Sequence, residues 1–330
     1  MEPGLKPPYV WFGGKRSVAD LVWAALGNPR HYLEPFFGGG AVLLARPDAP
    51  ELETINDIDG YVVNFWRAVQ ADPLAVAQHA ASPVYESDLH AWRARLSCRR
   101  ADFTSRQEGD PDFYDAQVAG RWMWGLNISI ATSFLSIAGP WKVVDGCLIK
   151  SDSGAGAGVV RGLPLLSHRL DYGIGCSLSN SIPENIKNRM LALSKRVSKV
   201  RVTCGDWSRI LSDCIVAAAG YPVGVFLDPP YSLAMRGNVY AEDHDVAADV
   251  SKWCAANGGN HDLRIVLAGY EGEHNNLQAL GWRVHAWKAN GGYANRGRGR
   301  ANDSAARERL WFSPGCLNQS HDLFTHGSSL

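Results

Sequence analysis

The sequence has no excess of charge of either sign, because its 330 residues hold 33 Lys and Arg against 33 Asp and Glu. This balance excludes a uniformly basic nucleic-acid coat protein. Only 20% of the residues are charged and 46% are hydrophobic, a composition that can bury a large core and that argues against disorder. The length suits one large domain or two smaller ones.

Long apolar runs and a secretory leader are also missing. No stretch of about 18 apolar residues occurs, so a membrane-spanning helix is not predicted. The N-terminal sequence MEPGLKPPYVW lacks the basic and then apolar pattern of a signal peptide. We therefore expect a soluble, cytoplasmic protein with no membrane partner.

Patterns typical of disulfide and metal sites are absent as well. The seven cysteines include no C-x-x-C pair, and the ten histidines never recur at i, i+4. Neither a disulfide framework nor a zinc site is predicted. Asp243, His244 and Asp245 are adjacent, but adjacent side chains point apart, so we interpret them as a solvated helix start and expect no metal.

Short apolar runs alternate with helical patterns along much of the chain. The helical stretch 60–71 places apolar residues on one stripe behind a capping residue, Asp59, and the stretch 245–257 has a similar face. This alternation predicts an α/β fold with a mostly parallel sheet covered on both sides. The last two strands have no helical pattern between them and should form an antiparallel pair at a sheet edge. The seven predicted strands are 31–34, 53–56, 200–203, 223–227, 263–268, 282–287 and 309–312.

The segment 72–187 breaks the alternation. It begins with a charged helical stretch, continues through a tryptophan-rich run and then passes through SDSGAGAG, which is flexible by composition. We interpret it as an inserted second lobe. The main domain would then comprise residues 1–71 and 188–330.

A glycine cluster follows the first predicted strand in HYLEPFFGGGAVLLAR, before an expected helix. Glycines there permit a tight turn and a close approach of the backbone to a ligand. Asp57, at the end of the second strand in INDID, can accept hydrogen bonds from ribose hydroxyls. A nucleoside cofactor is expected, and a dinucleotide stays an alternative although Val42 and Leu43 would crowd a pyrophosphate.

The most specific motif is VFLDPPYS at the end of the fourth predicted strand. Its two prolines fix the backbone and remove N–H donors, so nearby carbonyls are left as acceptors. Asp228 offers a carboxylate, Pro229 a carbonyl and Tyr231 an aromatic face. Two acceptors and a stacking partner suit an exocyclic amino group on a planar base. The alternative is a structural proline turn with a half-buried tyrosine.

The ordered motifs WFGGK, EPFFGGGAV, NDID, CGDW and DPPY resemble the Dam-type DNA adenine N6-methyltransferases. The resemblance covers roughly residues 8 to 70 and 200 to 312. It implies a Rossmann-like seven-stranded methyltransferase sheet with an inserted target-recognition lobe. It also implies an enzyme that moves a methyl group from S-adenosylmethionine to a flipped-out adenine in double-stranded DNA.

The same resemblance assigns roles to individual residues. Trp11 and Lys15 would lie against the methionine end of the cofactor, and Lys15 has a surface or phosphate-binding role as its alternative. Trp207 would border the adenine ring, with a place in the core as its alternative. The implied cofactor-binding set is Trp11, Lys15, Pro35, Phe36, Gly38, Gly40, Asp57 for the ribose, Ile58 for the adenine, Asp206, Trp207 and Asp228. The implied catalytic set is Asp228, Pro229, Pro230 and Tyr231.

A long glycine-rich loop, 288–304, separates the last two predicted strands. Its Arg296, Arg298 and Arg300 are either DNA contacts or part of an ordinary flexible loop. A homodimer and a cognate restriction endonuclease are candidate partners. Rival activities are methylation of cytosine N4, of RNA or of a glutamine amide, DNA binding by a catalytically silent relative, and nicotinamide-dependent oxidoreduction.

Overall fold

The computed structural model describes residues 5–9, 11, 13–48, 50–129, 134–135, 141–144, 147–150, 182–230, 246–287 and 308–317. These residues form two compact units. The first unit comprises Met1–Gly14 and Asp57–Asp206, and the second comprises Lys15–Asn56 and Trp207–Leu330. No described helix is both long enough and apolar enough to cross a membrane.

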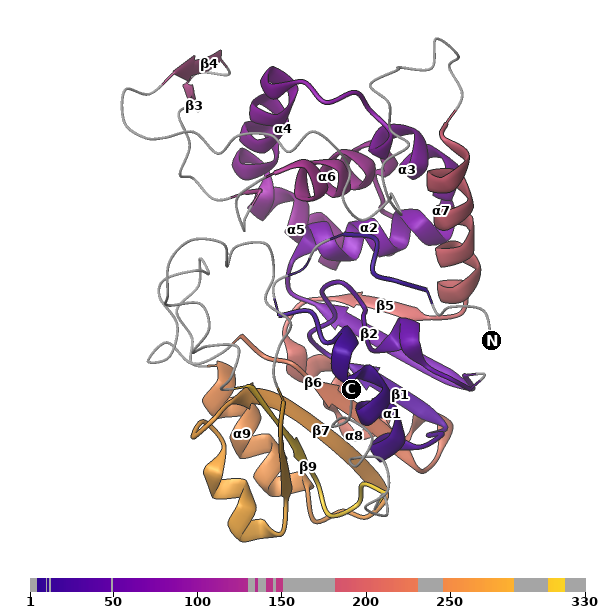
Figure 1. Ribbon diagram of the computed structural model, residues 1–330, viewed down its shortest axis with the longest axis vertical. Helices are drawn as coiled ribbons and strands as arrows, with labels where there is room; N and C mark the ends of the chain where they lie inside the picture. The colour runs from indigo at the N-terminus through magenta and orange to yellow at the C-terminus, as the bar shows by residue number, and fades with distance from the viewer. Residues whose placement is uncertain are drawn as a thin grey trace, which may run out of the picture. The chain divides into compact units, whose positions relative to one another are not determined.

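A seven-stranded sheet organises the fold, with strand order β5-β2-β1-β6-β7-β9-β8 (Figure 1). Pairs β1–β2, β1–β6 and β6–β7 are parallel, whereas β9 is antiparallel to both β7 and β8. All seven predicted strands and the antiparallel edge pair are therefore confirmed. The strands are β1 His31–Glu34, β2 Leu52–Asp57, β5 Arg201–Cys204, β6 Val223–Leu227, β7 Leu263–Tyr270, β8 Arg283–Ala286 and β9 Glu308–Phe312.

In the second unit, the central strands are covered on both faces. Val225 and Leu227 of β6 share a buried cluster with Val250 and Cys254 of α9 (Val246–Asn257). Gly224, the residue before Val225, faces Leu26 of α1 (Ala19–Leu26) on the opposite side of the strand. Such alternation is what a strand buried on both sides requires. The remaining helices of this unit are the short η1 Arg16–Val18, η2 Leu43–Ala45, η3 Trp207–Leu211, α8 Asp213–Val216, η4 Ala217–Ala219 and η5 Asn275–Leu280.

The first unit is mainly helical. Its helix α2 (Gly60–Ala71) has the predicted bounds, and the Asp59 carboxylate caps it by accepting a hydrogen bond from the Tyr61 N–H at 2.9 Å. Helices α2, α3, α6 and α7 pack side by side (Figure 1) around large buried aromatics such as Trp66 and Trp122. The other helices are α3 Pro73–Ala80, α4 Glu86–Cys98, α5 Arg100–Gly109, α6 Ala116–Ile128 and α7 Glu184–Val197.

Two local features differ from the sequence-based expectations. The helix predicted after the glycine cluster is wrong, because only the 3-10 turn η2 forms there before the chain turns at Arg46 toward β2. A hairpin of β3 (Trp141–Val144) and β4 (Cys147–Lys150) lies within the segment 72–187 and was not predicted. Each strand of this hairpin spans only four residues, which is too short to give a clear alternating pattern in the sequence.

Candidate active site

The glycine turn lies at the carboxyl end of β1, the edge of a parallel sheet where ligands usually bind. Gly38 and Gly40 have φ of 48° and 68°, in the left-handed region that favours glycine. The Gly40 N–H donates to the Phe37 carbonyl at 2.9 Å, and a Cβ at Gly40 would lie 2.6 Å from the Phe37 ring. The turn therefore depends on glycine for its shape.

Asp228 lies directly after β6, at the same edge of the sheet. The Lys15 ammonium is 2.9 Å from Asp228 Oδ1, and the Lys15 side chain is only 2% exposed. Burial raises the pKa of the Asp228 carboxyl above its ordinary value, and the charge and hydrogen bond of Lys15 oppose that shift. The ion pair therefore favours the carboxylate form in a site that would otherwise favour the neutral acid.

Two residues that the sequence did not single out complete the surroundings of Lys15. Glu308, the first residue of β9, places Oε2 3.6 Å from the Lys15 ammonium. The centroid of the Trp287 ring lies 5.9 Å from the same nitrogen, within the range of a cation–π interaction. Lys15 thus lies among two carboxylates and an indole.

Glu34 is a second buried carboxyl at this edge, at the end of β1. Burial raises its pKa well above the ordinary value, the hydrogen bond from Tyr32 opposes this, and the charge of Asp228 adds to it. The Tyr32 hydroxyl donates to Glu34 Oε2 at 2.8 Å. The two carboxyls thus have different partners. Asp228 lies beside the Lys15 ammonium, and Glu34 lies beside the Tyr32 hydroxyl.

Phe36 and Trp207 meet on the same unit. Their ring centroids are 6.1 Å apart, and their planes differ by 25°. Both side chains are partly buried and pack against the main apolar cluster of this unit. Trp207 therefore packs against the core and keeps part of its surface exposed, and its contact with an adenine ring stays a prediction.

In the first unit, Asp57 ends β2 with its carboxylate oriented by its own loop. Asp57 Oδ1 accepts a hydrogen bond from the Asp59 N–H at 2.9 Å, and the Asp57 carbonyl accepts one from the Gly205 N–H at 3.1 Å. The next side chain, Ile58, is 59% exposed although it is apolar, and Asp206 is exposed. A carboxylate beside an exposed aliphatic surface suits a nucleoside.

Trp11 lies in an aromatic group of the first unit. Its ring centroid is 5.8 Å from that of Tyr9 in an edge-on arrangement and 6.1 Å from that of Trp122. It is partly exposed, so a ligand contact and a packing role are both available to it.

The predicted site residues have different outcomes. The structure brings Lys15 together with Asp228, and Phe36 with Trp207. Pro35 is buried beside the turn, and Pro229 and Pro230 follow Asp228 as predicted. Tyr231 and the loop arginines Arg296, Arg298 and Arg300 lie outside the described residues. Glu34 could have been suspected as an acid next to the glycine turn, whereas nothing in the sequence near Glu308 marks it.

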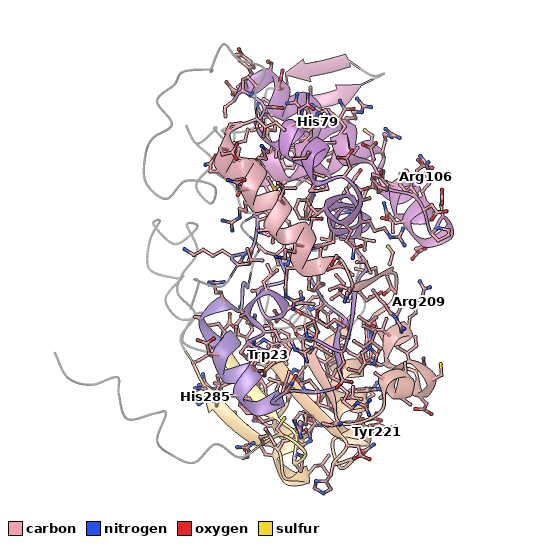
Figure 2. All side chains as sticks on the ribbon, turned by 90° about the vertical axis from the view of Figure 1, so that its right-hand side faces the viewer. Trp23, His79, Arg106, Arg209, Tyr221 and His285 are labelled. Atoms are coloured by element: carbon pink, nitrogen blue, oxygen red, sulfur yellow. The ribbon has the colours of Figure 1, made fainter. Side chains whose placement is uncertain are left out.

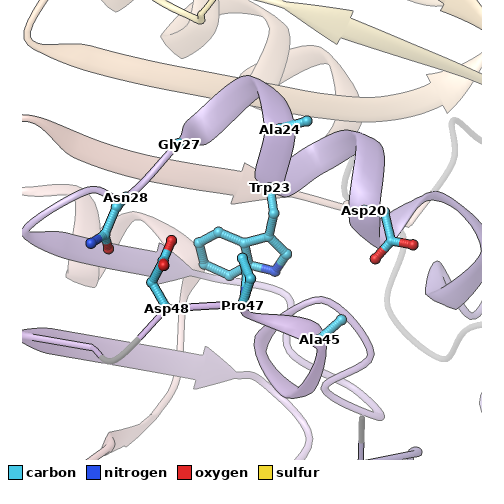
Figure 3. A pocket seen from close by; sticks show the side chains of 8 residues that line it. All are labelled: Asp20, Trp23, Ala24, Gly27, Asn28, Ala45, Pro47 and Asp48. Atoms are coloured by element: carbon cyan, nitrogen blue, oxygen red, sulfur yellow. The ribbon is translucent and has the colours of Figure 1, made fainter. Parts of the chain in front are cut away.

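A shallow pocket of about 360 Å³ lies elsewhere on the second unit. Figure 3 shows the indole of Trp23 between Asp20 at one end and Asn28 with Asp48 at the other. Trp23, also labelled in Figure 2, packs on Tyr32 with ring centroids 4.7 Å apart. Its lining comes from segments that precede β1 and β2, so the pocket lies near the amino ends of these strands and not at the Asp228 edge.

Comparison with known families identifies the enzyme class. No curated protein matches the sequence. Residues 11–103 match the family of D12 class N6 adenine-specific DNA methyltransferases. This region holds Lys15, the glycine turn and Asp57, and the mixed seven-stranded sheet is of the Rossmann-like methyltransferase type. The match over residues 11–103 supports an adenine-specific DNA methyltransferase of the Dam type, a transferase that acts on DNA with a methyl donor.

Proposed function

We propose that the chain transfers the methyl group of S-adenosylmethionine to N6 of an adenine flipped out of double-stranded DNA. One observation carries this proposal. Asp228 lies at the carboxyl end of β6, ion-paired with buried Lys15 and followed by two prolines. An ionised acceptor on a stiff backbone is the arrangement that an amino group of a base requires.

The chemical task of these residues is to activate a poor nucleophile. The lone pair on adenine N6 is delocalised into the ring. Asp228 and the Pro229 carbonyl accept the two N6 hydrogens, which localises the lone pair on nitrogen and aims it at the methyl group. Tyr231 provides the face on which the extruded base stacks.

The described residues fit S-adenosylmethionine as the methyl donor. Asp57 presents a carboxylate for the ribose hydroxyls, and Ile58 presents an exposed aliphatic surface for the adenine ring. Gly38 and Gly40 keep the turn after β1 free of side chains. When bound, this cofactor supplies an electrophilic methyl group on a positively charged sulfur.

The other assignments rest on the same reading. In this proposal Trp11, Lys15, Pro35, Phe36, Asp206 and Trp207 line the rest of the cofactor site. Residues 1–71 and 188–330 form the catalytic domain, and 72–187 form the lobe that recognises the target. Arg296, Arg298 and Arg300 contact phosphates of the DNA. The candidate protein partners are a second copy of the chain and a cognate restriction endonuclease. The enzyme works in the cytoplasm.

Substitution of Asp228 by alanine tests the proposal. Asp228→Ala should abolish transfer of tritiated methyl groups to DNA, because one of the two N6 acceptors is lost. Binding of S-adenosylhomocysteine should stay largely intact, since the proposed ribose and adenine contacts come from Asp57 and Ile58. Asp262→Ala, which removes an exposed carboxylate at the other edge of the sheet, is the matched control.

Mass spectrometry of nucleosides from the methylated DNA identifies the modified atom. N6-methyladenine as the product, together with an inactive Asp228→Ala, supports the proposal. Full activity of Asp228→Ala would remove this carboxylate from the reaction, and N4-methylcytosine as the product would overturn the choice of base.

A further inference from the structure

The topology of the sheet delivers the start of β9 to the edge where Asp228 lies. Strand β6 is parallel to β7, and Leu227 is opposite Leu267. Strand β9 is antiparallel to β7, and its first residue, Glu308, is opposite Tyr270 at the end of that strand. The reversal of one strand therefore brings an acid from near the end of the chain to the carboxyl edge of the parallel strands.

The contacts of Lys15 at this edge are graded. Its ammonium lies 2.9 Å from Asp228 Oδ1, a hydrogen-bonded ion pair, and 3.6 Å from Glu308 Oε2, which is a charge contact at longer range. The side chains of Lys15 and Glu308 are 2% and 7% exposed, whereas that of Asp228 keeps 22% exposure. Lys15 and Glu308 are thus enclosed, and Asp228 is open to a ligand.

We propose that Glu308 is a positioning residue for methyl transfer, which acts by holding Lys15 against Oδ1 of Asp228 so that the other carboxylate oxygen faces the adenine amino group. This inference rests on the function proposed above. Glu308 itself does not touch the substrate in this arrangement. Its effect is transmitted through the Lys15 ammonium.

The burial of Lys15 explains why a second acid is needed. A lysine taken out of water must be compensated by partners, and its flexible stem has many rotamers. A single carboxylate that must also engage a substrate would share its charge between two tasks. Glu308 supplies a second carboxyl partner from a strand residue, and the Trp287 ring limits the volume in which Lys15 can move.

Three variants separate this role from others. Glu308→Gln keeps the size of the side chain but removes its charge, and Glu308→Asp keeps the charge on a shorter stem. Glu271→Gln is the matched control, because Glu271 lies just beyond the end of β7 and pairs with Arg309 at 2.8 Å on an exposed side chain. Each variant is assayed for kcat, for KM with DNA and S-adenosylmethionine, and for thermal unfolding.

For Glu308→Gln we expect kcat at the pH plateau to fall on the order of tenfold to a hundredfold, because misplacement of a reacting group lowers the rate by about this much. Both KM values should change little. Glu308→Asp should recover part of the loss, and Glu271→Gln should match the wild type. Among the described residues, Lys15 pairs with Asp228, the charge of Asp228 acts on Glu34, and Glu308 lies against Lys15. If Glu308 acted merely as a nearby negative charge, its removal would shift the acid limb of the profile to lower pH and leave the plateau unchanged.

A second readout does not depend on activity. Acetylation of the free protein by a small amine-reactive reagent, followed by peptide mass spectrometry, reports the accessibility of each lysine. Lys15 should react slowly in the wild type relative to Lys252, whose side chain is 79% exposed. Its relative rate should rise in Glu308→Gln and stay unchanged in Glu271→Gln.

The outcomes distinguish this inference from the proposed function. An unchanged plateau kcat and unchanged Lys15 acetylation in Glu308→Gln, with an active wild type and an inactive Asp228→Ala, overturn the positioning role alone. Loss of the folded state in Glu308→Gln, with full kcat in Glu308→Asp and in any folded fraction, also overturns it. A wild type without methylation activity overturns the proposed function instead, and the acetylation result then still decides whether Glu308 restrains Lys15.

Discussion

At the scale of single residues, the carboxyl edge of the sheet places two acids in different environments. Asp228 has an ammonium against one oxygen, whereas Glu34 receives a phenol hydrogen bond and has its pKa raised well above the ordinary value. Pairs of titratable groups whose environments push their pKa values apart often divide the tasks of a site. Here Lys15 favours the carboxylate form of Asp228, whereas burial favours the neutral form of Glu34.

The pH dependence of methyl transfer should report the Lys15–Asp228 pair. Asp228 must be ionised to accept a hydrogen bond, so activity should fall as the pH drops through its raised pKa. Lys15 lowers that pKa, and its removal leaves burial unopposed. In Lys15→Gln the acid limb of the kcat profile should therefore move to higher pH.

Two comparison variants make this result specific. Lys15→Arg retains a positive charge and should leave the acid limb near its wild-type position, even if the different head group lowers kcat. Lys252→Gln removes an exposed lysine that pairs with Asp249 on α9 and should change nothing. An acid limb that stays in place in Lys15→Gln would mean that this ammonium does not stabilise the Asp228 carboxylate.

At the scale of elements, the link between β1 and η2 is set by glycine conformation. Gly40 has a φ of 68°, and the ring it would strike on gaining a Cβ belongs to Phe37, which is 3% exposed and has little room to move. Gly40→Ala should lower the free energy of unfolding by about 1–3 kcal/mol. Urea unfolding followed by circular dichroism measures the loss.

Gly259 provides the matched position for this test. A Cβ there meets no atom within 4 Å, so Gly259→Ala should change the free energy of unfolding by less than about 0.5 kcal/mol. Equal stabilities of the two variants would show that the turn tolerates an L side chain. A weaker binding of S-adenosylhomocysteine in folded Gly40→Ala would in addition support the proposed cofactor site.

The elements also show what local sequence patterns can and cannot predict. The strands were predictable because apolar runs bounded by turn residues recur along the chain, and α2 was predictable to its capping residue Asp59. The single turn η2 was not, because the apolar residues after Gly40 suit a helix as well as a buried loop. Periodicity reports burial, and burial alone does not determine the backbone shape.

The candidate site was predictable in its motifs and not in its contacts. Asp228 and the prolines stand in a recognisable motif, and Asp57 stands at the end of a strand, where a ribose-binding acid is expected. The pairing of Lys15 with Asp228 joins residues far apart in the sequence, and the place of Glu308 depends on the direction in which β9 runs. Both depend on tertiary topology, which no local pattern of charge or hydrophobicity encodes.

At the scale of the whole molecule, the residues proposed to bind the cofactor occur in both compact units, each described by itself. Lys15, the glycine turn and Asp228 belong to the unit of the central strands, whereas Trp11, Asp57, Ile58 and Asp206 belong to the helical unit. A ligand that binds only the folded chain should raise its free energy of unfolding. Stabilisation by a ligand is therefore the test suited to this scale.

Thermal unfolding with S-adenosylhomocysteine should give a clear shift, because a ligand that binds only the folded state at a hundred times its Kd stabilises it by about 2.7 kcal/mol. For a chain of this size that corresponds to a rise of a few degrees in Tm. Asp57→Ala should greatly reduce the rise, because the ribose loses its acceptor, whereas the exposed Asp112→Ala should keep it. NAD at the same concentration should give no rise, since the large residues Val42 and Leu43 follow the glycine turn closely and are expected to crowd a pyrophosphate. A rise with NAD, or an undiminished rise in Asp57→Ala, would contradict the assignment of the cofactor or of its ribose-binding residue.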